Sequence, residues 1–228
     1  MDSGRTAGQP SGGRAGPAAP DFDRLLADGY AHDASYLRPG CVATARVVPG
    51  DRLRLPTGRL VAAEPLANGY PFTQTVPPGD YPVEVVLAQY TDQGQPRGAV
   101  SFTEVAAARV VVRPEPAHTW RLALHDGQDA ADLAEGEIFG YPVDGGTGSF
   151  GSVEVFQALV DDDEARDDLI ADASFDRDEP SVTYTHEETG TNLVMFTSGG
   201  GDGVYPTWVG YTAGGEVTCF LTDFGVLT

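Results

Sequence analysis

Four carboxylates of this chain stand beside glycine turns or at the ends of expected strands, and their residue type could carry chemistry. They are Glu64, Asp144, Asp202 and Asp223. Hard divalent cations are bound by carboxylate oxygens gathered from several loops, and one acid of a crowded pair can serve as a general acid or base. If the fold brings these loops together, they form a metal or acid–base site. Asp next to Gly also favours turns in its own right, because its side chain bonds nearby backbone amides.

The glycines around two of these acids predict turns of defined shape. Four glycines surround Asp202 between residues 199 and 203, and glycine adopts positive φ at little cost. We expect a tight turn between two strands here, and a pocket lined by Gly145, Gly146, Thr147, Gly201, Gly203, Tyr205 and Trp208. The two aromatic residues of that set also suit the core of a late strand.

Other catalytic patterns are not found in the sequence. The four histidines lie far apart, without the spacing of zinc ligands, and no serine sits in a nucleophile-elbow motif. Cys41 and Cys219 lie in apolar segments with no catalytic histidine nearby, so we expect both to be buried free thiols. No cofactor motif is identified, and a divalent metal is the cofactor that the acids would suit.

The charge of the chain restricts its partners. Thirty-four acidic residues stand against 14 basic ones, all of them arginine, which gives a formal net charge of −20. Such a charge repels phosphate backbones and anionic lipids, so nucleic acid and membrane are not expected as partners. A basic protein is the partner class that fits, although solubility is the simpler explanation of the charge and a salt-adapted surface is a second one. With no export signal or membrane-spanning run, we expect a cytoplasmic location.

The elements that position the acids are mostly strands. We expect residues 1–20 to be a disordered tail and residues 21–228 to form one domain that begins with a short helix at 21–26. Strands are expected at 44–48, 53–55, 59–64, 81–90, 106–112, 119–124, 182–185, 193–196, 204–212 and 216–222. A turn is expected at 49–51, an extended segment at 70–76 and a hairpin connection at 213–215. Helices in the second half are expected only within 152–175. The fold class is therefore α+β and predominantly β, with antiparallel sheets and a few short helices.

Several motifs occur in a distinctive order, namely Thr57–Leu66, Val76–Val83, Val143–Gly148, Ser198–Trp208 and Thr222–Phe224. This set resembles a bacterial family known as the domain of unknown function numbered forty-two forty-one, over about Leu53 to Leu227. The resemblance implies a soluble bacterial protein with no settled activity, and it makes the four carboxylates the counterparts of the family's motif acids.

Two departures from the family pattern bear on the acids. The family usually has Asp-Pro where this chain has Glu64-Pro65, which keeps a carboxylate at a longer reach. A further family Asp is missing at Phe150-Gly151-Ser152, which argues against a catalytic use of the acids. Our leading hypothesis is an acidic binding or protein-interaction module. The alternative is a divalent-metal-dependent hydrolase that uses the four loop carboxylates.

Overall fold

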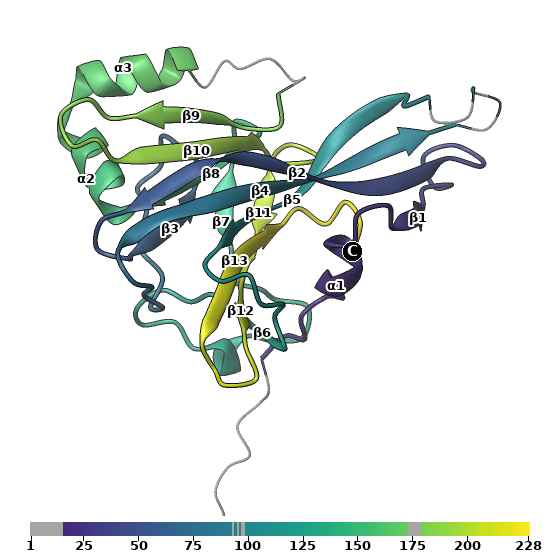
Figure 1. Cartoon of the computed structure of the whole chain (residues 1–228), viewed down its shortest axis with the longest axis horizontal. Helices are drawn as coiled ribbons and strands as arrows, with labels where there is room; N and C mark the ends of the chain where they lie inside the picture. The colour runs from purple at the N-terminus through teal and green to yellow at the C-terminus, as the bar shows by residue number, and fades with distance from the viewer. Residues whose placement is uncertain (1–15, 93, 95, 97–98, 173–178) are drawn as a thin grey trace, which may run out of the picture.

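In the computed structural model, two antiparallel sheets pack against each other (Figure 1). Their central strands are apolar at successive positions, so side chains are buried on both faces of each sheet. The structure describes residues 16–92, 94, 96, 99–172 and 179–228. Within them the larger sheet has seven strands, in the spatial order β1 (Ala31–Asp33), β2 (Val42–Leu55), β4 (Gly79–Thr91), β5 (Phe102–Val111), β13 (Val217–Asp223), β12 (Thr207–Tyr211) and β6 (Thr119–Leu122). The strand-rich, antiparallel fold class expected from the sequence is confirmed.

A smaller sheet covers one face of the larger one. Its strands, in spatial order, are β3 (Leu60–Ala63), β8 (Thr147–Ser152), β10 (Asn192–Thr197) and β9 (Val182–Thr185). A separate ladder pairs β11 (Gly203–Tyr205) with β7 (Tyr141–Val143). The helices are α1 (Phe22–Leu25), α2 (Val153–Asp161) and α3 (Asp163–Asp172), and a 3₁₀ turn, η1, spans Ala130–Asp132.

Three hydrophobic clusters within the described residues fill the spaces between these layers. The first lies between the two sheets, and the second lies between the larger sheet and α1. The third lies between the smaller sheet and the helices α2 and α3. Side chains of one strand alternate between clusters: in β10, Val194 joins the first and Met195 the third. This alternation follows from the two-residue period of a strand.

One turn and one strand expected from the sequence differ in the structure. The Pro49-Gly50-Asp51 segment does not end a strand: β2 runs through it with a bulge, and the pairing with β4 resumes at Arg52. A bulge accommodates Pro because residues at a bulge leave the regular ladder. The expected strand 204–212 is divided at Pro206, so that β11 pairs with β7 and β12 joins the larger sheet.

Most of the remaining strand and turn predictions agree with the structure, and two details differ. Val110 and its neighbours form a strand, the 213–215 hairpin joins β12 to β13, and α2 and α3 separate at Asp162. Residues 70–76 hold two isolated bridges rather than a strand. Val160, expected on the buried face of α2, is exposed, and Val155 lies on that face instead.

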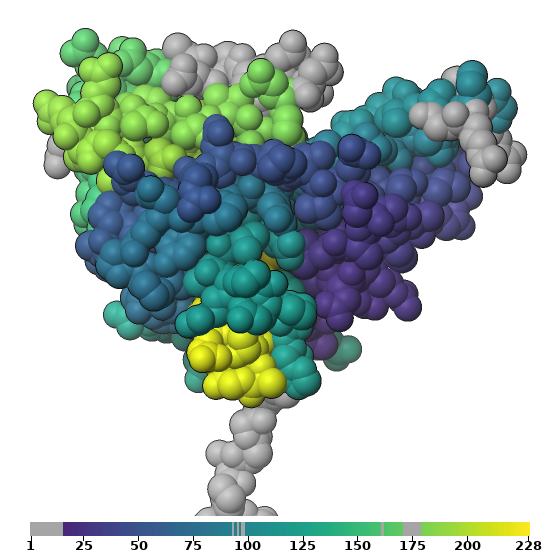
Figure 2. Space-filling view, in the orientation of Figure 1, coloured from purple at the N-terminus to yellow at the C-terminus, as the bar shows by residue number. Residues whose placement is uncertain are grey.

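The long strands β2 and β4 extend beyond the smaller sheet as an arm, which Figures 1 and 2 show projecting from the body. Helix α1 lies beneath this arm, and its cap is the expected Asp21, whose carboxylate accepts a hydrogen bond from the Arg24 amide. Most of the expected N-terminal tail, residues 1–15, lies outside the described residues. Residues 16–20 have no regular structure, and Ala19 packs against the second cluster.

The two cysteines are buried free thiols, as expected. None of the helices formed by the described residues is long and apolar enough to cross a membrane.

Gly58 provides a test of the turn that joins β2 to β3. Its φ is +72°, and a Cβ added there would lie 1.7 Å from the Val76 carbonyl oxygen. We expect Gly58→Ala to lower the free energy of unfolding by about 2–5 kcal/mol, since left-handed strain adds to overpacking. Gly127→Ala is the matched control, because Gly127 has φ +84° with no neighbour within 4 Å. That variant carries the strain alone, about 1–2 kcal/mol. Urea unfolding followed by circular dichroism measures both, and equal losses would contradict the packing argument.

Candidate functional site

Two glycine-rich loops lie side by side because of how their flanking strands pair. Residues 144–146 connect β7 to β8, and residues 198–202 connect β10 to β11. Strand β8 pairs with β10, and β7 pairs with β11, so both loops leave the smaller sheet at the same place. We call these two loops together with Glu64 the glycine-loop corner.

One hydrogen bond joins the two loops, and two more shape the second loop. The Ser198 amide donates to the Gly146 carbonyl at 3.0 Å, and the Ser198 hydroxyl donates to the Gly201 carbonyl at 2.6 Å. The Tyr205 hydroxyl also donates to Gly201, at 2.8 Å. Gly199 has φ +57° and Gly201 has φ +106°, conformations that side chains other than glycine rarely adopt. The expected tight turn around Asp202 is therefore present.

Glu64 lies in the corner, where its carboxylate binds the backbone of the 144–146 loop. It follows β3, which pairs with β8 and so ends near the 144–146 loop. Its Oε1 accepts a hydrogen bond from the Gly145 amide at 2.6 Å, and its Oε2 lies 3.5 Å from the Asp144 amide nitrogen. This contact fixes the 144–146 loop in place.

Asp144 and Asp202 are the exposed acids of the corner. In the described part of the chain, neither takes part in an ion pair. Burial raises the pKa of the Tyr205 hydroxyl, and the neighbouring Asp202 charge adds to this rise. Two carboxylates on adjacent, hydrogen-bonded loops offer acceptors for a cationic group at a rigid surface.

Asp223 has a different environment. It ends β13 and is 5% exposed, and its Oδ1 accepts a hydrogen bond from the Gly225 amide at 2.9 Å. The Thr228 hydroxyl donates to the same carboxylate, with its shortest distance 3.0 Å to Oδ2. Burial raises the pKa of Asp223, and these hydrogen bonds partly oppose that rise. The side chain caps the turn that follows β13.

Three of the four expected acids, Glu64, Asp144 and Asp202, therefore lie in the glycine-loop corner, and the four acids have different roles. Glu64 and Asp223 accept hydrogen bonds from the main chain, and Asp144 and Asp202 face solvent. Among the residues that the structure describes, no group of three or more His, Cys, Asp or Glu side chains could hold a metal ion. The described residues therefore do not form the four-carboxylate centre that the hydrolase alternative requires.

Most of the expected pocket residues lie in this corner, which is open to solvent. Gly145, Gly146 and Gly201 belong to the two loops, and Thr147, Gly203 and Tyr205 belong to the strands β8 and β11 that follow them. Trp208 does not: it is 1% exposed and belongs to the second cluster, on the opposite face of the larger sheet. It contacts Phe22 edge-on, with ring centroids 5.8 Å apart. At Pro206 the chain passes from β11, which pairs with β7, to β12 of the larger sheet. Tyr205 and Trp208 therefore lie in different parts of the structure.

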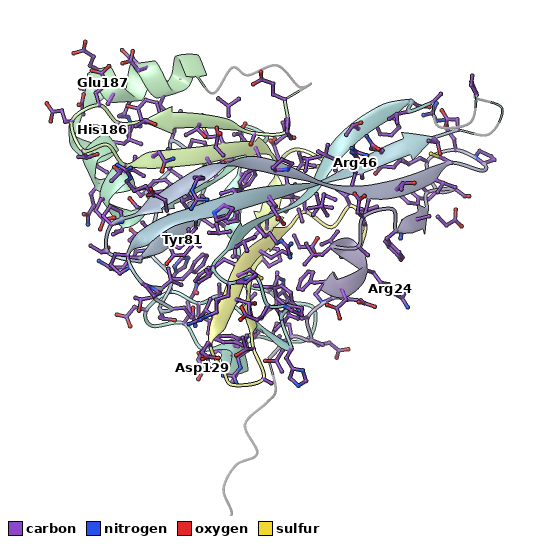
Figure 3. All side chains as sticks on the ribbon, viewed as in Figure 1. Arg24, Arg46, Tyr81, Asp129, His186 and Glu187 are labelled. Atoms are coloured by element: carbon purple, nitrogen blue, oxygen red, sulfur yellow. The ribbon has the colours of Figure 1, made fainter. Side chains whose placement is uncertain are left out.

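Sequence reasoning missed a polar contact at the junction of α2 and α3. His186, which is labelled in Figure 3, is buried, and its Nε2 lies 3.6 Å from Oδ2 of Asp162. Its Nδ1 accepts a hydrogen bond from the Thr189 amide at 3.3 Å, and Asp162 Oδ1 caps the Ala165 amide at 2.9 Å. The position of Asp162 between two helical segments is a sequence signal for a helix cap. Its partner His186 could not be predicted in this way, because it is distant in the chain.

Fold and site together define a mostly β protein in which two sheets carry a glycine-loop corner with exposed carboxylates. The chain belongs to the family described as Protein of unknown function (DUF4241), whose model matches residues 53–222. That match confirms the resemblance found from the motifs. A search of curated proteins and a search of solved structures each returned no match.

The Glu64 contact predicts a matched pair of variants. Glu64→Ala removes the acceptor of the Gly145 amide, and we expect it to lower the free energy of unfolding by about 1–3 kcal/mol. Glu64→Gln keeps an acceptor oxygen at the same reach, so we expect it to retain most of that stability. Thermal and urea unfolding measure both. Equal losses in the two variants would show that the negative charge, rather than the hydrogen bond, is what matters.

Asp223 predicts a pH dependence of stability. Because its pKa in the fold lies above the ordinary value of about 3.9, its contribution is fully present below that pH and is lost as pH rises through the folded pKa. Asp223→Asn removes the ionisation and keeps an acceptor for the Gly225 amide. We therefore expect this variant to gain stability relative to wild type between about pH 4 and pH 7. Urea unfolding at fixed ionic strength measures the difference, and a difference independent of pH would contradict the assignment.

Proposed function

We propose that this protein is a binding module that recognises a basic segment of a partner protein, and that the glycine-loop corner contributes to the recognition. The observation that carries the proposal is the pair of exposed carboxylates, Asp144 and Asp202, on two adjacent loops held by hydrogen bonds. No described arginine or histidine neutralises either of them.

The charge of the whole chain supports the same partner class. A net charge of −20 attracts a basic protein over a distance and speeds the encounter, and it repels nucleic acid and other acidic surfaces. Rigid loops favour binding because little conformational entropy remains to be lost when the partner arrives. The hydrogen bonds of Ser198 and Tyr205 supply this rigidity.

A labelled peptide tests the proposal directly. The probe is a fluorescent decapeptide of alternating arginine and serine, and its binding is measured by anisotropy from low to high NaCl concentration. We expect binding to weaken steeply with salt, because exposed charges are screened. The double variant Asp144→Asn/Asp202→Asn should bind about five- to tenfold more weakly than wild type at low salt, the sum of two exposed ion pairs.

Glu187→Gln/Glu188→Gln is the matched control. It removes two exposed charges from the turn between β9 and β10, at another surface of the molecule. We expect it to change the affinity less than about twofold, because only the general attraction is reduced. If both double variants weaken binding equally, the corner has no special role and net charge alone acts. If the peptide shows no salt-dependent binding to wild type, the binding-module proposal is wrong.

A further inference from the structure

A groove lies between the N-terminal segment and the loop that precedes β7. Its volume is about 590 Å³, within the range of pockets that hold a small ligand or a few side chains. Its apolar lining comes from Pro17, Ala18, Leu133, Ala134, Gly136 and Ile138. Two carboxylate residues, Glu135 and Glu137, complete the wall.

Local interactions hold the walls of this groove in place. Asp129 caps the 3₁₀ turn η1 by accepting the Ala131 amide at 2.9 Å. The loop then folds back on itself, since the Ala134 amide donates to Glu137 Oε2 at 2.8 Å and the Glu137 amide donates to the Ala134 carbonyl. Leu133 packs against the second cluster and anchors the loop to the larger sheet. The groove is therefore formed before any partner binds.

Apolar side chains form part of the groove wall, and the connection that forms the rest of it is strongly acidic. Residues 126–137 contain five acids and no basic residue. Asp129 and Glu137 accept hydrogen bonds from backbone amides of their own loop. The other three acids of this connection are Asp126, Asp132 and Glu135. No described residue forms an ion pair with any of them. Figure 3 shows Asp129 at the end of the molecule opposite His186 and Glu187.

We propose that this groove docks the basic partner segment by taking up one of its apolar side chains, with flanking arginine or lysine residues paired with the carboxylates of residues 126–137. This inference rests on the proposed function, and it adds the groove to the glycine-loop corner as a second part of the recognition surface. Charge complementarity selects the occupant: a second copy of this chain carries the same −20 and is repelled, whereas a basic segment is attracted.

The chain between groove and corner limits the length of the partner segment. Ile138 and Asp144 are six residues apart, so their Cα atoms are separated by at most about 22 Å. An extended segment of ten residues reaches about 33 Å. One short segment can therefore contact both the groove and the glycine-loop corner.

The experiment compares two peptides on the full chain. One is the arginine–serine decapeptide, and the other carries leucine in place of its two central serines. We expect the leucine peptide to bind wild type about tenfold more tightly, as burial of one leucine side chain predicts. Ile138→Asn should abolish this gain and leave the salt dependence of both peptides intact. Leu37→Asn is the control, because Leu37 is similarly exposed, 45% against 37%, and lies outside the groove.

Amide chemical shifts of wild type keep the test decisive if Ile138→Asn fails to fold. We expect the leucine peptide to shift the Ala18, Ala134 and Ile138 amides more than the serine peptide does. Equal affinity of the two peptides, a gain that survives Ile138→Asn, or shifts confined to other surfaces would each overturn the groove assignment. In those cases the salt-dependent binding would still stand. A self-associated dimer with these amides at its interface would also overturn the assignment.

Discussion

Burial of both faces of both sheets is the constraint on which this structure depends. Each central strand serves two hydrophobic clusters at once, as Phe220 and Leu221 of β13 do on opposite faces of the larger sheet. A strand in this position cannot shift its pairing by one residue, because each side chain would then move to the wrong cluster. The register is therefore strongly specified, and the loops that leave the strands inherit fixed positions.

The corner follows from this constraint. Loops 144–146 and 198–202 are distant in sequence, yet the pairing of β8 with β10 and of β7 with β11 brings them together. Recognition surfaces made from loops depend on such scaffolds, because a loop alone pays a large entropic cost for holding one shape. Glu64 adds a contact from a third element, since its carboxylate binds the Gly145 amide.

Much of the architecture could be predicted from local patterns, whereas its breaks could not. The apolar run at 193–196 and the Gly-rich hairpin at 213–215 depend on neighbours in the chain, and both predictions agree with the structure. Pro49-Gly50 has the local chemistry of a turn, but the continued pairing of β2 with β4 makes it a bulge. Whether an acid is exposed or bonded also depends on distant residues: Glu64 and Gly145 are 81 positions apart. For this reason sequence identified the acids of the site but not the different roles of Glu64, Asp144 and Asp223.

Both tryptophans of the chain lie in the same cluster. Trp208 is fully buried there, and Trp120, half-buried, meets the same Phe22 ring. Intrinsic fluorescence of this protein therefore reports on the layer between the larger sheet and α1. The layer between the two sheets, which carries the glycine loops, contains no indole among its described residues. A ligand at the corner can bind tightly and leave the emission spectrum unchanged, so this binding has to be followed with a label on the ligand.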